Sequence, residues 1–439
     1  MRMEAFFGFA EQLCDGLCGN EILFANLARE SSDFVRLNQN RVRQAGHVRA
    51  LALTLTLSGG AKQVEGSCDL SGDPDQDLAR ARTLLAGLRA RLAHVPEDPY
   101  LNLSLQPTRS ERRASACAPA SHSAVETLIA AADGLDLVGI WASGEMADGL
   151  ASSLGHRHWH ESVSFHLDWS LYLEGDKAVK GVYSGFRWEP DCLRRRLATL
   201  TDGLRAMARP AKTLEPGRYR AYLAPSAVQE LMDMLAWGGF DLKSHRTHQT
   251  PLLRMVRGER AFDPRISIRE EHKRGLVPTF TPEGFLLPPH VDLITAGQLA
   301  GCLVDARTAR EFGAAVNASS GAPASLALAP GALEECDILA RLGTGLWIGH
   351  LWYCNWSDPN DCRVTGMTRF GTYWVENGEI VAPVKVMRFD DSLYHLLGDR
   401  LEDLTAAREL LMSPQTYDGR SSDSAVLPGI LVAGIDLTL

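Results

Sequence analysis

The sequence lacks the short motifs that mark several common enzyme classes. It has no P-loop, no Gly-x-Gly-x-x-Gly between a strand and a helix, and no Gly-x-Ser-x-Gly around a nucleophilic serine. Its nine cysteines include no Cys-x-x-Cys pair. These absences argue against P-loop and dinucleotide-binding enzymes, α/β-hydrolases and a disulfide framework.

The chain is also short of positive charge and of long apolar runs. With 45 basic against 54 acidic residues, its net charge of -9 argues against a general nucleic-acid binder. No apolar run approaches the length that spans a bilayer, and the N-terminus does not resemble a secretory signal. We therefore expect a cytoplasmic protein with reduced thiols that binds neither membrane nor nucleic acid directly.

At 439 residues the chain is too long for one ordinary core. The pattern predicts an α+β protein, in which an N-terminal α/β region precedes a large, mainly antiparallel, β-rich C-terminal region with short helices. A short polar stretch with Pro and Gly at 212–220 is the best boundary between them. The expected division is 1–115 and 116–215 for two N-terminal subdomains, and 216–439 for the C-terminal domain.

Periodicity predicts a helix-rich first half and a strand-rich second half. In the first half, helices are expected at 4–30, 73–95, 121–132 and 191–207, strands at 34–60, 135–143 and 152–172, and no regular structure at 100–120. In the second half, strands are expected at 266–268, 285–287, 293–294, 325–328, 346–352, 371–375 and 384–389, with short helices at 333–342, 392–397 and 406–411. Asn377-Gly378 predicts a hairpin turn, since this pair supports positive φ.

Residues 224–253, near the middle of the chain, contain the most informative predicted helix. Pro225 and Ser226 suit a helix start, and Val228, Leu231 and Leu235 give one apolar face. Gly238-Gly239 then provides a stop. Whether this helix carries chemistry depends on residues 229–234.

Several segments occur together in the order of a known family. They are residues 34–46, 263–265, 280–284, 293–299 and, the closest match, Trp-Val-Glu-Asn-Gly-Glu-Ile-Val-Ala-Pro-Val at 374–384. Through this ordered series of segments, the chain resembles the TldD/PmbA (TldE) family over most of its length. That family is associated with metal-dependent proteolysis in the cytosol, and older usage describes its members as modulators of DNA gyrase.

The resemblance implies which branch of the family the chain follows. The TldD-like branch carries His-Glu-x-x-x-His on the central helix and a late cysteine, which together hold zinc. Here Gln229, Glu230 and Met234 occupy that window, no cysteine follows Cys362, and residues 424–434 resemble the TldE-like ending. The resemblance therefore implies a non-catalytic subunit without a cofactor of its own. Its partner would be a zinc-bearing TldD-like subunit or a second copy, and its substrate an unfolded peptide.

Two histidine groups leave alternatives open. His156, His158 and His160 alternate, so on a strand they share one face, which is either a transition-metal site or a polar, solvent-facing surface. His245 and His248 lie in an expected loop after Gly238 and Gly239; these four residues are either candidates for peptide contact or part of an ordinary surface loop. The rival functions are an independent metal-dependent hydrolase with a His-based site, and a homodimeric peptide- or partner-binding protein without protease activity.

Aromatic residues concentrate in one part of the strand-rich half. Trp347, Trp352, Tyr353, Trp356 and Trp374 are either core residues or the lining of a groove for an extended peptide.

Overall fold

A computed structural model describes residues 1–114, 119–175, 177–417 and 419–439. Helix accounts for 25% and strand for 42% of the chain, in two large, mainly antiparallel sheets, so the predicted α+β class is confirmed. The boundary predicted between residues 115 and 116 lies outside the described residues. No described helix is both long and apolar enough to cross a membrane.

The first sheet has seven strands in the order β3-β2-β1-β5-β6-β4, with β7 also paired to β6. Its strands are β1 (Ile22–Asn38), β2 (Arg41–Gly59), β3 (Lys62–Asp69), β4 (Arg109–Arg112), β5 (Asp136–Ser152), β6 (Arg157–Glu174) and β7 (Lys177–Gly185). Gln39 and Asn40 both have positive φ, the geometry of a tight two-residue hairpin between β1 and β2. Both predicted N-terminal subdomains contribute strands, since β1 pairs with β5; the division itself remains a prediction.

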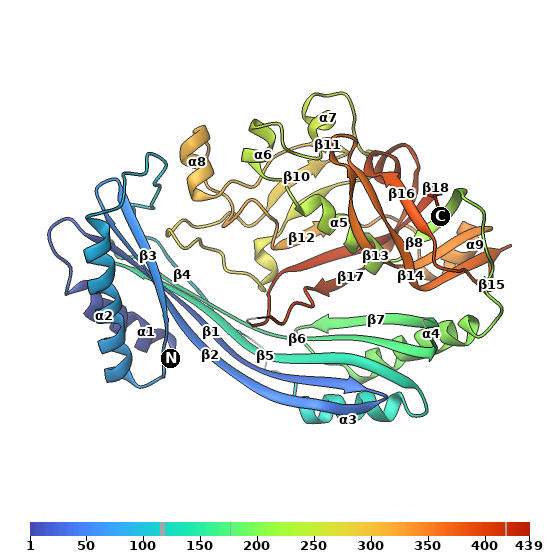
Figure 1. The fold of residues 1–439 in the computed structure, drawn as a ribbon, viewed down its shortest axis with the longest axis horizontal. Helices are drawn as coiled ribbons and strands as arrows, with labels where there is room; N and C mark the ends of the chain where they lie inside the picture. Colours follow the sequence, from blue (N-terminus) through green and yellow to red (C-terminus); the bar gives the residue numbers. More distant parts are fainter. Residues whose placement is uncertain (115–118, 176, 418) are drawn as a thin grey trace.

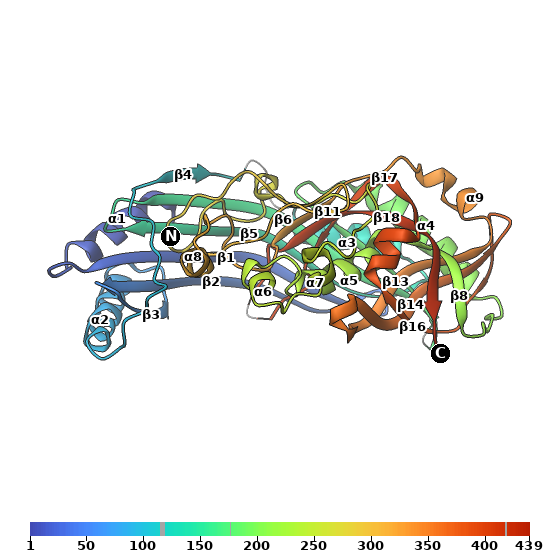
Figure 2. The same cartoon turned by 90° about the horizontal axis from the view of Figure 1, so that it is seen from above.

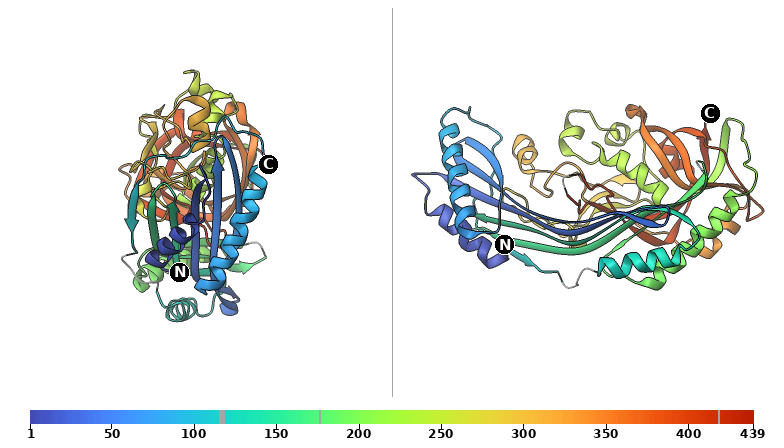
Figure 3. Two further views of the ribbon diagram at one scale, coloured as in Figure 1. Left: turned by 90° about the vertical axis from the view of Figure 1, so that its left-hand side faces the viewer. Right: turned by 60° about the horizontal axis from the view of Figure 1, so that its bottom comes forward.

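Four helices pack on this sheet in two pairs. At one end lie α1 (Met3–Cys14) and α2 (Pro74–Leu92), and at the other α3 (Ser121–Ala131) and α4 (Pro190–Met207). Asp73 caps α2 by accepting from the backbone N–H groups of Asp75 and Gln76. Figures 1 and 3 show the long strands curving beneath the C-terminal part of the chain, with α3 and α4 on the opposite side of the sheet.

The second sheet has eleven strands and includes a closed ring. Its path is β11-β10-β9-β12-β18-β16-β14-β13-β8, and the additional pairing of β18 with β8 closes the last five strands on themselves. The bounds are β8 Gly217–Leu223, β9 Ile268–Glu270, β10 Val291–Thr295, β11 Gln298–Leu299, β12 Ser325–Leu328, β13 Gly345–Asp358, β14 Arg363–Glu376, β15 Glu379–Pro383, β16 Arg388–Ser392, β17 Leu401–Met412 and β18 Ser424–Leu437. The helix α5 (Pro225–Ala236) contacts β8, β13, β17 and β18. Figure 2 shows the two parts of the molecule from above.

The remaining helices of this part are short. They include α6 (Leu242–Arg246), α7 (Leu253–Val256), α8 (Ala306–Phe312), α9 (Ile338–Leu342) and a π-helical turn at His395–Asp399. The hairpin turn predicted at Asn377-Gly378 is confirmed, because both residues take positive φ between β14 and β15.

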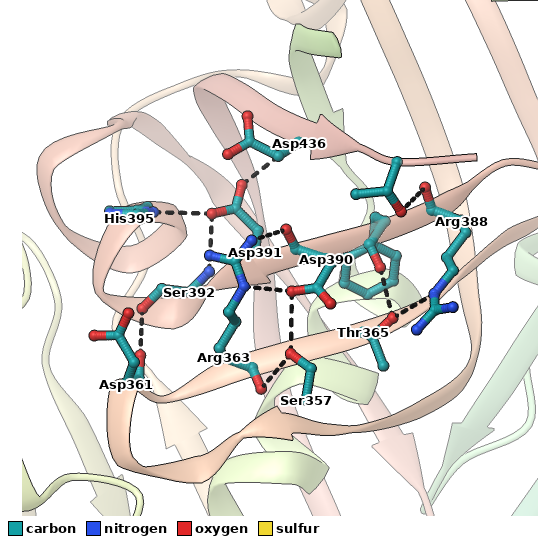
Figure 4. A network of polar contacts seen from close by, with 12 residues as sticks. Ser357, Asp361, Arg363, Thr365, Arg388, Asp390, Asp391, Ser392, His395 and Asp436 are labelled. Atoms are coloured by element: carbon teal, nitrogen blue, oxygen red, sulfur yellow. Dashed lines mark hydrogen bonds and ion pairs between the residues drawn. The ribbon is translucent and has the colours of Figure 1, made fainter. Parts of the chain in front are cut away.

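Buried polar contacts join β14, β16 and β18 near the π-helical turn (Figure 4). The Asp391 side chain is fully buried and accepts from His395 Nδ1 at 2.9 Å and Arg400 Nη1 at 2.8 Å. It also accepts from the backbone N–H groups of Ser392 and Asp436, at 2.8 and 3.0 Å. A buried carboxylate with four donors is fully satisfied, and here it ties β16 to β18, to the π-helical turn and to Arg400.

Several sequence predictions are wrong, each for a local reason. Residues 4–30 do not form one helix, because α1 ends at Cys14 and the buried apolar run from Leu23 enters β1. The helix expected at 406–411 is part of β17, where pairing with β18 overrides helix propensity. Residues 100–120 include the strand β4, which pairs with β6, and their positions 115–118 lie outside the described residues.

The first half is also richer in strand than predicted, since it carries the entire seven-stranded sheet. In the second half, residues 285–287 form no strand and contribute only an isolated bridge between Phe280 and Leu286. The strand at 325–328 and the helices at 73–95, 121–132 and 191–207 are confirmed.

Candidate functional site

The central helix α5 has a fixed position because its apolar face is entirely buried. The side chains that are fully shielded from solvent are Ala227, Val228, Leu231, Met232 and Leu235. The helix ends at Ala236 because Gly238 takes φ +81°, which favours glycine. Glycine is also required at 239, where a Cβ would lie 2.2 Å from the Leu235 carbonyl oxygen.

The window predicted from the zinc family falls on α5, but its side chains do not converge. Gln229 and Glu230 are half-buried, whereas Met234 is 7% exposed and belongs to the core of the C-terminal part. Positions five apart on a regular helix point roughly 140° away from each other. An amide and a thioether are in any case poor zinc ligands, so this helix does not fit a zinc ion. Among the described residues, no three His, Cys, Asp or Glu side chains form a group that could hold a metal.

Glu230 faces His350 of β13, a residue that sequence reasoning missed. Glu230 Oε1 lies 3.9 Å from His350 Nε2, beyond hydrogen-bonding distance. Burial lowers the pKa of His350 to about 3, with Lys180 adding to the effect, so the imidazole is neutral and the contact is polar, not ionic. Neither of its ring nitrogens makes a hydrogen bond of normal geometry within the described residues, although the Ser226 backbone favours the protonated ring.

Burial also perturbs Glu230 and Cys354 at this point. It raises the pKa of Glu230 to about 7, with Asp233 adding to the shift and Lys180 opposing it. It raises the pKa of the Cys354 thiol to about 12, with Glu230 and Asp233 contributing. A carboxyl that titrates near neutral pH can take up or release a proton there. Cys354 stays a neutral thiol and does not replace the thiolate that a zinc site needs.

Exposed aromatic side chains lie next to His350. Its ring centroid is 5.9 Å from that of Phe370, which lies 6.5 Å from that of Trp352. The guanidinium of Arg369 lies over both rings, 5.1 Å from the Phe370 centroid and 6.0 Å from that of Trp352. Trp352 is 43% and Tyr353 76% exposed. Irregular pairing of β13 with β14 turns these side chains outward.

The other predicted aromatic residues have different surroundings. Trp356 and Trp374 pack against the core of the C-terminal part, and Trp347 packs on two smaller clusters. The groove interpretation is therefore limited to Trp352 and Tyr353.

The alternating histidines at the start of β6 are buried, so the expected solvent-facing surface is wrong. His156, His158 and His160 are at most 1% exposed. His156 Nδ1 accepts from the Thr108 backbone N–H at 3.1 Å, and Nε2 lies 2.8 Å from the Ser104 carbonyl oxygen. His158 Nε2 lies 2.9 Å from Thr108 Oγ1 and Nδ1 lies 2.8 Å from Ser110 Oγ.

These contacts occupy all four ring nitrogens of His156 and His158. Burial lowers the pKa values of His158 and His160 to about 4, so both rings are neutral at pH 7. The geometry is that of a hydrogen-bonded core, which holds the segment around Thr108 against β6.

The two histidines of the second group, His245 and His248, have different surroundings. His245 lies in α6, not in a loop, and its Nε2 is 2.7 Å from the Gly239 carbonyl oxygen, so two of the predicted residues are in contact. His248 follows the helix, is exposed and takes φ +56°. The contact of His245 with Cys302 was not foreseen, because residues 57 positions apart carry no local signal.

Comparison with known proteins places this arrangement in context. Residues 216–439 match the family model described as PmbA/TldA metallopeptidase C-terminal domain. A comparison with curated protein sequences gave no match.

Among solved structures, TldE from Thermococcus kodakarensis superposes with a TM-score of 0.77 at 15% identity and covers 100% of both chains. A candidate modulator of DNA gyrase from Thermotoga maritima gives 0.75 at 14% identity, covering 99% of each chain. A second candidate gyrase modulator, from Bacteroides thetaiotaomicron, gives 0.72 at 14% identity and covers 99% of this chain and 98% of its own. At such identities the likeness concerns the fold alone.

Proposed function

Because the chain belongs to the PmbA/TldA metallopeptidase family, we propose that it is the non-catalytic, TldE-like subunit of a two-subunit zinc protease that acts on unfolded peptides. In this proposal a TldD-like partner holds the zinc ion, and the present chain binds no cofactor. Its own contribution is to hold the substrate and complete the protease.

The observation that carries the proposal is the state of α5. The helix keeps Glu230 at a half-buried position beside His350. The two end positions of the window, however, carry the amide Gln229 and the core methionine Met234. Zinc would supply an acidified water molecule in the catalytic branch, whereas an amide and a thioether, both poor zinc ligands, stand here where the resemblance expects two imidazoles. The scaffold of the site is thus present while its metal ligands are missing.

Two features of this region suit an extended peptide. Among the named strands, β7 pairs with β6 alone, so its other edge is not used by a strand pairing. Lys180 of β7 lies near enough to Glu230 and His350 to shift both pKa values. Addition of a strand reads the backbone of a peptide, and Trp352 and Tyr353 add apolar contact area.

The test is reconstitution with a partner that carries His-Glu-x-x-x-His. The two purified proteins are mixed at micromolar concentration with a fluorescent unfolded peptide, and complex formation is followed by size-exclusion chromatography. We expect cleavage only in the mixture, and its loss with a zinc chelator. Cleavage by this chain alone, or no complex at micromolar concentration, would refute the proposal. A homodimer that binds the peptide without any cleavage would favour a partner-binding protein.

A matched pair of variants tests the role of the aromatic residues in the reconstituted protease. Trp352→Ala should raise KM for the peptide several-fold and leave kcat within about twofold, because an aromatic contact contributes roughly 0.5–1.5 kcal/mol to binding. Tyr100→Ala is the control, since Tyr100 also carries an arginine over its ring (Arg307, 5.2 Å) but lies outside this region. An unchanged KM for Trp352→Ala would show that the peptide does not contact this surface.

A further inference from the structure

Cys302 and His245 form a side-chain pair that the proposed function does not use. Cys302 Sγ lies 3.3 Å from His245 Nδ1, and His245 Nε2 lies 2.7 Å from the Gly239 carbonyl oxygen. A nucleophile, a base and a group that orients the base therefore follow one another at hydrogen-bonding distances. The three residues come from the end of α5, from α6 and from the segment after β11.

The hydrogen bonds fix the imidazole tautomer. A carbonyl oxygen only accepts, so Nε2 carries the proton and donates to Gly239. The lone pair of Nδ1 then faces the thiol and accepts its hydrogen. His245 is 6% exposed, which holds the ring in this orientation.

The backbone around the thiol is also held in place. Asn317 Nδ2 donates to the Cys302 carbonyl oxygen at 2.9 Å, and Asn317 Oδ1 accepts from the Val304 N–H at 2.8 Å. Cys302 is partly exposed, whereas the His245 ring beside it is covered.

The resting pair is neutral. Burial raises the pKa of Cys302 to about 11, with Asp241 adding to the shift and Arg246 opposing it. Burial lowers the pKa of His245, and the Gly239 carbonyl and Asp241 oppose that change. The Asp241 carboxylate is itself occupied by the backbone N–H groups of Lys243 and Ser244. A separated thiolate and imidazolium are disfavoured here, so the proton must move during the reaction and not before it.

We propose that Cys302 and His245 form a nucleophilic pair that adds to small, neutral α,β-unsaturated carbonyl compounds. Sγ forms a bond to the β-carbon, and the π electrons of the C=C bond move to give an enolate. The thiol proton passes to His245 Nδ1 and from there to the α-carbon, which leaves a thioether and a neutral imidazole. Addition suits this site better than displacement, because it returns the proton and releases no anion.

The first test uses acrylamide, with labelling of each cysteine followed by peptide mass spectrometry in the folded protein. Cys18 and Cys336 are exposed and serve as references in the same sample. Without a base, a thiol with a pKa of about 11 holds roughly 300-fold less thiolate at pH 7 than an ordinary thiol with a pKa of about 8.5. We expect Cys302 to react at least as fast as the references at pH 7, with little change in rate from pH 7 to 8.5. If Cys302 is labelled hundreds of times more slowly than the references, and its labelling rate rises tenfold per pH unit, the proposal is overturned.

The second test removes the base. His245→Gln should slow labelling of Cys302 at least 30-fold and leave Cys18 and Cys336 unchanged, whereas the control His290→Gln, an exposed histidine elsewhere, should change none of the three. Cys362 is fully buried and reports folding, since it is labelled only if the variant opens. If folded His245→Gln labels Cys302 at the wild-type rate, His245 is not a base. If that variant unfolds, the pH profile of the wild-type protein decides.

Discussion

The buried Asp391 should be among the costliest carboxylates to remove from this protein. In Asp391→Ala, Arg400 keeps one carboxylate partner, Asp436, at 3.2 Å, and the N–H groups of Ser392 and Asp436 and the His395 ring lose their acceptor. Breaking one side of a buried ion pair costs about 3–5 kcal/mol. Because Arg400 retains one partner, we expect a loss of about 3–4 kcal/mol in the free energy of unfolding.

The control is Asp202→Ala, which makes the same change in net charge at the surface. Asp202 pairs with Arg205 at 2.8 Å, but both side chains are more than 70% exposed, so its loss should cost below about 1 kcal/mol. Urea denaturation of the three proteins gives the comparison, with a shifted midpoint and an unchanged slope for Asp391→Ala. Asp391→Asn keeps the shape and should cost less than the alanine variant. If Asp391→Ala and Asp202→Ala differ by less than about 1 kcal/mol, the network in Figure 4 does not stabilise the fold as argued.

Three further predictions concern a carboxyl group, a glycine and an arginine that are wholly or partly buried. The pKa of Glu230 is about 7 in the folded protein against an ordinary 4.5, so its contribution to stability is lost as pH rises from about 4.5 through 7. Glu230→Gln should therefore be roughly 1–2 kcal/mol more stable than wild type at pH 8 and equal to it at pH 4 by urea denaturation; a benefit that does not depend on pH would contradict this cause. Gly144→Ala should cost more than about 3 kcal/mol, because its Cβ would lie 2.1 Å from the Ser31 carbonyl oxygen, whereas Gly46→Ala, with nothing within 4 Å, should change the melting temperature little. Arg420→Met should lower the free energy of unfolding by about 2–4 kcal/mol, since the buried guanidinium donates to Ser32, Gly144 and Ser164, while Met at the exposed Arg113 should have no such effect.

The sequence predicted elements well where one signal was strong and local. Asp73 and Pro74 mark the start of α2, and Asn377-Gly378 marks the hairpin turn between β14 and β15. Both were predicted because caps and turns are set by a few adjacent residues. The helix at 406–411 failed for the opposite reason: residues of β17 are held by β18, and such pairing leaves no trace in a short window. The buried run entering β1 was joined to α1 because an apolar stretch alone does not separate strand from helix.

The candidate site was predicted only in part. The central helix was located at the right residues, and Gly238 ends it as expected, whereas the correspondence of residues 229–234 to a zinc motif stays a prediction. His350 and Cys354 were missed as partners of Glu230, since more than a hundred positions separate them from α5 and only the closed strand ring brings them together. The burial of His156 and His158 was likewise invisible, because their partners lie in a segment that seemed to lack regular structure.

The position of β18 has a consequence for how the protein is made. This strand follows every other strand of its sheet in the sequence, yet it pairs with β8, β12, β16 and β17. During synthesis, the ring around α5 therefore cannot close until Ser424–Leu437 has left the ribosome. Until then β8, β12 and β17 present unpaired edges, which are prone to association with other chains. The seven-stranded sheet needs no residue beyond Gly185 and can form earlier, as a platform on which the later half assembles.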